Sequence, residues 1–118
     1  MRLAVINPNS TVSMTEKAVV AAQWAAPGAT VLGITCHKSP AAIQGPEDDA
    51  ICRPFVLTEV ARAARDGADA IIIACFDDTG LDAARCLTDR PVIGIGEAGP
   101  SRCVWVVMTV SRWCASRS

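Results

Sequence analysis

The sequence has no excess of positive charge. Its 11 Lys and Arg residues are offset by 12 Asp and Glu residues, the formal net charge is −1 at pH 7, and no basic stripe is present. A nucleic-acid surface needs clustered positive charge to neutralise phosphates. We therefore expect no nucleic-acid partner.

Long apolar runs are also missing. No run approaches the roughly 20 residues that a membrane-spanning helix needs. The first residues, MRLAVINPNS, lack the apolar segment of a signal peptide. We expect no membrane partner and a cytoplasmic location. The 118 residues, 51% of them hydrophobic, suit one small domain with its own core.

The cysteines include no C-x-x-C pair, so a structural zinc site has little support and no metal is expected. An even number of cysteines can form disulfides in a secreted chain, but without a secretory signal free thiols are expected. Most of them are expected to be small buried hydrophobic residues. The six cysteines are Cys36, Cys52, Cys75, Cys86, Cys103 and Cys114.

Nucleotide-binding and hydrolase motifs are largely absent. The chain has no Walker loop and no G-x-S-x-G elbow. The segment GIGEAG at 94–99 matches G-x-G-x-x-G, but Pro100 follows directly and no acid lies after Glu97. A dinucleotide site needs a helix there and an acid about twenty residues further on. A glycine turn is therefore the favoured interpretation.

Other polar groups give weaker signals. His37, the single histidine, directly follows Cys36. Neighbouring side chains on an extended chain point apart, so we expect a solvated loop histidine rather than a catalytic pair. The acidic pairs at 48–49 and 77–78 match no calcium-loop spacing and are interpreted as solvated loop residues.

Short β-branched runs alternate with longer helical stretches. Strands are predicted at 3–6, 30–35, 70–74 and 92–95, and helices at 12–24, 47–65 and 81–87. This order predicts an α/β fold with a mainly parallel, four- to five-stranded sheet and flanking helices. Residues 104–110 are the candidate fifth strand. Because the connection to it is short for a helical crossover, this segment either pairs antiparallel or is poorly ordered.

Local signals mark the ends of the predicted helices. Ser13 and Glu16 have the spacing of a capping box at the start of the first helix. In the second helix, Pro54 is expected to limit or kink the helix, and Gly67 fits its C-terminal stop.

Two loops at the carboxyl edge of the predicted sheet form the candidate site, because ligands of parallel α/β sheets bind beyond that edge. In loop 7–11, Asn9, Ser10 and Thr11 offer donors that suit an anion or, as spacing alone favours, an ordinary helix N-cap. In the other loop, Cys75 ends the most apolar strand. Backbone N–H groups there favour a thiolate and can stabilise an oxyanion. Cysteine is also a common buried residue, so both interpretations stay open.

Four segments, in order, carry a family resemblance. They are INPNST at 6–11, IQGPED at 43–48, ACFDDTGLDAAR at 74–85 and PVIGIGEA at 91–98. With them, the chain resembles the Asp/Glu/hydantoin racemase superfamily, and especially its hydantoin and allantoin racemase branch. The resemblance covers about residues 1–98, and ACFDD-x-GL is its most specific part.

The resemblance implies one half of a two-domain, pseudo-symmetric fold with the active site in the cleft between the halves. It implies cofactor-independent chemistry in which one cysteine removes an α-proton and a second returns a proton to the opposite face. Cysteine suits this work because both of its protonation states are accessible near neutral pH. The resemblance assigns the first catalytic role to Cys75, substrate contacts to Asn9 and Ser10, and the pocket lining to Phe76 and Asp77.

The chain also departs from the family pattern. Family members are about twice as long, their second cysteine lies in the second half, and they commonly have proline at the position of Thr79. Neither Cys103 nor Cys114 has the context of that second cysteine. VVMTVS at 106–111 is similar to a later family strand, which would make Thr109 a substrate contact.

The last residues differ in composition from the rest. Segment 99–118 contains two of the three tryptophans, two of the six cysteines and no acid. We therefore expect a racemase-like domain at 1–98 and an atypical C-terminal tail at 99–118, as in a truncated or frame-disrupted family member. A homo-oligomer is one way to supply a missing wall of the site.

The favoured function is that of a cofactor-independent racemase acting on a small-molecule substrate, namely a hydantoin, allantoin or another amino-acid derivative. Two alternatives stay open. One is a catalytically inactive α/β fragment that binds small anions. The other is a relative of arylmalonate decarboxylases, which also work with a single cysteine, although theirs lies late in the chain.

Overall fold

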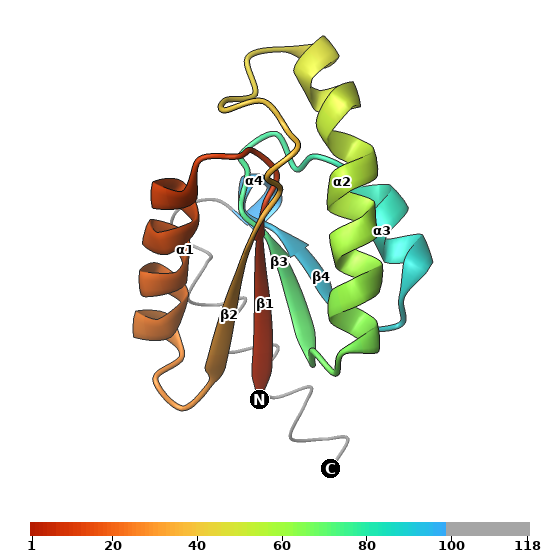
Figure 1. Cartoon of the computed structure of the whole chain (residues 1–118). Coiled ribbons are helices and arrows are strands. Elements are labelled where there is room, and N and C mark those ends of the chain that lie inside the picture. Colours follow the sequence, from red (N-terminus) through yellow and green to blue (C-terminus); the bar gives the residue numbers. More distant parts are fainter. Residues whose placement is uncertain (99–118) are drawn as a thin grey trace.

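A four-stranded parallel sheet organises the chain in the computed structural model, which describes residues 1–98 (Figure 1). The strands are β1 (Arg2–Asn7), β2 (Thr30–Thr35), β3 (Ala70–Ile73) and β4 (Val92–Gly94). The helices are α1 (Val12–Ala25), α2 (Pro46–Arg65), α3 (Leu81–Leu87) and α4 (Ile95–Ala98). The strand order is β2-β1-β3-β4 and every pair is parallel. The predicted α/β class and four strands are confirmed, whereas the candidate fifth strand lies outside the described residues.

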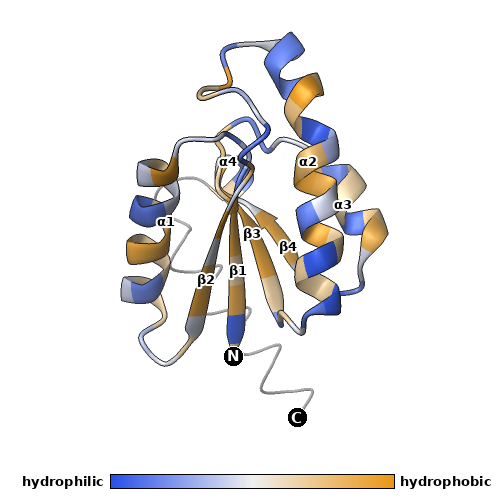
Figure 2. Ribbon diagram, viewed as in Figure 1, coloured by the Kyte–Doolittle hydropathy of each residue, from blue (hydrophilic) through white to orange (hydrophobic). Residues whose placement is uncertain are grey.

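Helices cover both faces of the sheet, with α1 on one side and α2 and α3 on the other (Figure 1). Alternate side chains of a strand point to opposite faces. Ile6 and Ile73 therefore pack under α2 and α3, whereas Val5 and Ile72 pack toward α1. All four residues of β3 are buried, which explains its continuous apolar sequence. Figure 2 shows the apolar strands of the sheet between helices that mix polar and apolar residues. None of the helices within residues 1–98 is long and apolar enough to cross a membrane.

The start of α1 differs from the prediction. The helix begins at Val12 with Thr11 as N-cap, and no side chain caps it. Ser13 therefore lies inside the first turn, so the predicted capping box of Ser13 and Glu16 is wrong. The Thr11 hydroxyl instead donates a hydrogen bond to the carbonyl of Ala41, at 2.7 Å. This bond ties the start of α1 to the loop that follows β2.

Helix α2 runs through Pro54 for 20 residues, so Pro54 does not limit this helix, and the kink predicted as the other possibility stays a prediction. Proline removes one backbone donor from a helix interior. The apolar face of α2 is nevertheless buried on both sides of it, at Cys52 and at Val56. Packing on both sides keeps the element continuous.

Gly67 ends α2 as predicted. It has a positive φ of 96°, a conformation that glycine adopts without steric cost. The N–H of Ala68 bonds the carbonyl of Ala63 at 3.0 Å, and the N–H of Gly67 bonds that of Ala64 at 3.3 Å. This pair of bonds is a Schellman motif, which satisfies the last helical carbonyls.

Two glycines of GIGEAG, Gly94 and Gly96, let two segments approach each other closely. A Cβ on Gly94 would overlap the Asp78 carboxylate, and a Cβ on Gly96 would overlap the Phe76 carbonyl. Residues 95–98 form one helical turn, α4, rather than the predicted glycine turn. The glycines therefore serve the packing of β4 and α4 against the loop after β3.

We predict that Gly96→Ala lowers the free energy of unfolding by about 1–3 kcal/mol, the usual effect of overpacking. The reason is that the backbone carbonyl of Phe76 has to move to admit a methyl group. Chemical denaturation measures the change. Gly28→Ala is the matched control, because nothing lies within 4 Å of a Cβ at Gly28. Equal stabilities of the two variants would show that the approach is not tight in solution.

Candidate active site

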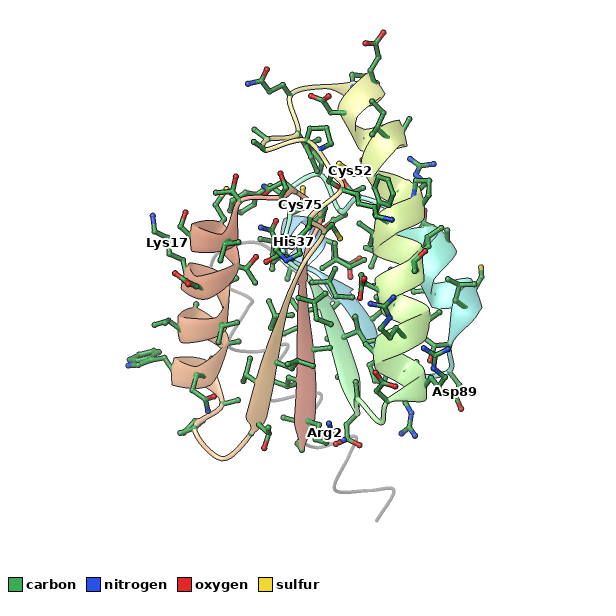
Figure 3. The ribbon with its side chains drawn as sticks, viewed as in Figure 1. Arg2, Lys17, His37, Cys52, Cys75 and Asp89 are labelled. Atoms are coloured by element: carbon green, nitrogen blue, oxygen red, sulfur yellow. The ribbon has the colours of Figure 1, made fainter. Side chains whose placement is uncertain are left out.

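The two predicted site loops leave the sheet side by side. β1 pairs directly with β3, with Ile6 opposite Ile73, and the N–H of Ala74 bonds the carbonyl of Ile6 at 2.8 Å. The loops after these strands therefore start at the same edge of the sheet. Figure 3 shows Cys75 at this edge, with Cys52 and His37 in the same region and Arg2 at the opposite end.

Buried asparagines fix the loop after β1. The Nδ2 group of Asn7 lies 2.8 Å from Oδ1 of Asn9 and 3.0 Å from Oγ1 of Thr15. In return, Oδ1 of Asn7 accepts the N–H of Asn9 at 3.1 Å. Asn7 is 1% exposed and Asn9 7% exposed. These contacts give the loop a single conformation because buried amide groups need their partners.

The same contacts use the backbone donors that the sequence offered to an anion. Oδ1 of Asn9 accepts the N–H of Thr11 at 2.9 Å. The N–H of Ser10 bonds the carbonyl of Pro40 at 3.0 Å. With the Asn9 N–H also bonded, the backbone donors of all three predicted residues are engaged. These three residues therefore offer an anion side-chain donors such as the Ser10 hydroxyl.

Cys75 lies directly beyond β3 and is partly exposed. Its Sγ is 3.8 Å from Oγ1 of Thr79. Thr79 is 1% exposed, and its hydroxyl donates to Oδ1 of Asp49 on α2 at 2.7 Å. Oδ2 of Asp49 in turn pairs with Arg53 at 2.7 Å. A run of polar contacts thus links the thiol to the second helix.

Asp78 joins the loop after β3 to α4. Its Oδ1 accepts the N–H of Gly96 at 2.8 Å, and its own N–H bonds the carbonyl of Cys75 at 3.1 Å. Asp78 has a φ of 50°, in the left-handed region that Asp tolerates better than most residues. Asp78 therefore holds the turn at Cys75 through its backbone N–H and ties that turn to α4 through its side chain.

The other described cysteines differ from Cys75. Burial, the Glu59 carboxylate and the neighbouring Cys52 raise the pKa of Cys36 to about 12. Burial also raises the pKa of Cys52, and the Ser39 hydroxyl partly offsets this shift. That hydroxyl forms no regular hydrogen bond with a described residue. Both thiols stay protonated near neutral pH. Cys86 is exposed, so the expectation of a buried cysteine fails there.

The remaining predicted site residues lie in different settings. Phe76 is 75% exposed, and Asp77 lines a hollow of about 380 Å³ with Arg53 and Glu97. A larger hollow of about 480 Å³ lies between β2 and α2, away from Cys75. Cys75 lines neither hollow. The candidate site is therefore defined by the position of the thiol beside the loop after β1 and not by the size of a hollow. Thr109 lies outside the described residues.

Sequence reasoning missed several polar residues that shape this region. It took the acidic pairs at 48–49 and 77–78 for solvated loop residues, but Asp49 is on α2 and bonds Thr79, and Asp78 bonds Gly96. Gly94 and Gly96 are the sequence signal that another segment, here the one with Asp78, packs closely against residues 94–96. His37 is exposed, as predicted. No three His, Cys, Asp or Glu side chains within residues 1–98 gather as a metal-ligand set.

Comparison with known proteins agrees with this geometry. The model of the family described as "Asp/Glu/Hydantoin racemase" matches residues 3–104. The hydantoin racemase of Paenarthrobacter aurescens is 44% identical over 113 residues, covering 94% of this chain and 48% of the relative. That of Rhizobium meliloti is 43% identical over 113 residues, covering 95% of this chain and 45% of the relative.

Solved structures give the same result. The allantoin racemase from Klebsiella pneumoniae has a TM-score of 0.79 and 41% identity, covering 83% of this chain and 40% of that one. The allantoin racemase from Pseudomonas fluorescens has a TM-score of 0.77 and 29% identity, covering 86% and 43%. This chain therefore spans less than half the length of these relatives. On its sequence and its fold, the chain belongs to the Asp/Glu/hydantoin racemase family.

Proposed function

We propose that this chain carries one catalytic face of a cofactor-independent racemase, with Cys75 as the acid/base and a hydantoin-type or related amino-acid derivative as substrate. The observation that carries the proposal is the position of Cys75. Its thiol lies beyond the central strand, next to the ordered loop after β1, at the edge where parallel sheets bind ligands.

Contrast with the neighbouring thiols supports this choice. Cys36 and Cys52 are 3% and 0% exposed, and the pKa of each is raised by burial. Proton transfer needs a thiol that reaches its substrate and takes both protonation states near the working pH. Of the three cysteines that residues 1–98 place at this edge, Cys36 and Cys52 are buried and Cys75 is partly exposed.

In the proposed step, the Cys75 thiolate removes the proton from the α-carbon, and the C–H electron pair moves to the carbonyl oxygen as an enolate. Hydrogen-bond donors at the site have to hold this charge. A proton returned from the Cys75 side regenerates the starting enantiomer, whereas one delivered from the opposite face gives the mirror image. Full racemisation therefore requires a second acid/base facing Cys75.

The loop after β1 is the proposed anchor for the substrate. Asn9 and Ser10 are held at the edge of the sheet by the backbone contacts of this loop. The engaged backbone leaves the Ser10 hydroxyl and the Nδ2 group of Asn9, which lies 3.5 Å from Sδ of Met14, as the proposed donors to a carbonyl or carboxylate. Phe76 and Asp77 follow Cys75 directly and are the proposed lining on the other side.

We expect the chain to exchange the α-proton of a 5-substituted hydantoin for deuterium, followed by NMR with each enantiomer and by optical rotation. Exchange with inversion indicates a complete two-sided site. Exchange with retention indicates one working face. No exchange above the blank with either enantiomer contradicts the proposal and favours an inactive fragment.

Cys75→Ser is expected to reduce this exchange to the blank, because a serine hydroxyl is far less acidic than a thiol. The variant should retain its fold because the change is small, and circular dichroism measures whether it does. Cys86→Ser is the matched control, since Cys86 is exposed on α3. Unchanged exchange in Cys75→Ser would remove this thiol from the mechanism.

Alkylation by iodoacetamide at pH 8 is expected to modify Cys75 and Cys86 but to spare Cys36 and Cys52. The pKa of Cys36, about 12, leaves almost no thiolate at that pH. A hydantoin should slow labelling of Cys75 and leave Cys86, the internal reference, unaffected. Peptide mass spectrometry measures each site, and equal slowing at both cysteines would argue against a substrate site at Cys75.

Ser10→Ala is expected to raise the KM for exchange by about three- to tenfold, the value of one hydrogen bond. Stability should not change, because Ser10 holds the loop through its backbone N–H. Steady-state kinetics and thermal unfolding separate the two effects. A drop in stability with no change in KM would assign Ser10 a structural role only.

A further inference from the structure

A buried hydroxyl connects the candidate catalytic thiol to a carboxylate on another element. Thr79 is 1% exposed, and its Oγ1 lies 3.8 Å from Sγ of Cys75 and 2.7 Å from Oδ1 of Asp49. We call this arrangement of Cys75, Thr79 and Asp49 the Thr79 bridge. It reaches from the loop after β3 to the start of α2.

The direction of the protons in the bridge follows from counting donors. A hydroxyl has one proton, and an ionised carboxylate can only accept. The short bond to Asp49 therefore uses the Thr79 proton. In the contact with Cys75, Thr79 is left as acceptor, so the thiol donates.

We propose that Thr79 and Asp49 are positioning residues that favour the protonated form of Cys75. A thiolate at Cys75 would face an oxygen lone pair unless Thr79 turned its proton away from Asp49. The bridge thus stabilises the state in which Cys75 has just received a proton. The catalytic consequence rests on the proposed function, whereas the preference for the thiol does not.

The bridge favours proton transfer from the substrate to Cys75. When the Cys75 thiolate takes the substrate α-proton, the C–H pair becomes the enolate and the new S–H donates to Thr79. No other oxidant, reductant or co-reactant is needed for this balance.

The other titratable groups of these elements have to be separated from the bridge. On α2 they are Asp48, Arg53, which pairs with Asp49, and the Cys52 thiol, which interacts electrostatically with Cys75. On the loop after β3 they are Asp77 and Asp78. Asp48 and Asp49 both act electrostatically on Cys52. Asp48 instead accepts the N–H of Gln44 at 3.0 Å, and it provides a matched carboxylate outside the bridge.

The test measures the rate of Cys75 alkylation by iodoacetamide between pH 6 and 10, with Cys86 as internal reference. Asp49→Asn replaces a carboxylate that can only accept with an amide whose Nδ2 can donate to Thr79, which lets Thr79 turn its proton to the thiolate. We expect it to speed Cys75 labelling at neutral pH by about tenfold, the value of a hydrogen bond to a charged group. Asp48→Asn removes an equal charge and should change the rate by about twofold or less.

A double-mutant cycle isolates the bridge from simple charge effects. In a Thr79→Val background, Asp49→Asn should have no larger effect than Asp48→Asn. Thr79→Ser keeps the hydroxyl and should retain the wild-type pH profile. If Thr79→Val does not fold, the comparison of Asp49→Asn with Asp48→Asn still decides, because Thr79 is intact in both.

Two results would overturn the inference. One is equal labelling rates for Asp49→Asn and Asp48→Asn. The other is an undiminished effect of Asp49→Asn without the Thr79 hydroxyl. Labelling requires no turnover, so the failure of hydantoin exchange leaves this test standing. Conversely, active exchange with no coupling through Thr79 would retain the proposed function and remove the bridge.

Discussion

The parallel pairing of β1 with β3 is the constraint on which the rest of the structure depends. It brings two segments almost seventy residues apart to the same edge, with the bond from Ala74 to Ile6 as the last rung of the ladder. Both strands are buried on both faces, so neither can slip by one residue without exposing its apolar side chains. The positions of Asn9 and Cys75 at the strand ends follow from this register.

Much of this arrangement could be predicted from the sequence. The continuous apolar run at 70–74 and the alternation of strands and helices gave the parallel sheet, because only a sheet covered on both faces has such strands. The edge that holds Cys75 followed from topology alone. Gly67 was a sufficient signal for the end of α2, since a positive φ at that position favours glycine.

The errors share a physical cause, which is contact between residues distant in sequence. Local spacing suggested a capping box at Ser13, but the N-cap is Thr11, two residues earlier, and its hydroxyl bonds the loop after β2. Acidic neighbours usually point to solvent, yet Asp49 meets Thr79 across 30 residues. Gly94 and Gly96 have a packing explanation here, since a side chain at either would collide with the Phe76–Asp78 segment. A match to G-x-G-x-x-G can therefore reflect close packing of the backbone as well as phosphate binding.

Pro54 divides α2 into two parts with different tasks. The turns before it contain Asp49, Arg53 and Cys52, whereas the turns after it place Val56 and Val60 in the core. Proline cannot donate to the carbonyl one turn back, so the helix lacks one rung where these parts meet. Bending is easiest at such a point. The Asp49–Thr79 bond and the buried Cys52 therefore hold the first turns of α2 in place, where the missing rung would otherwise let them bend.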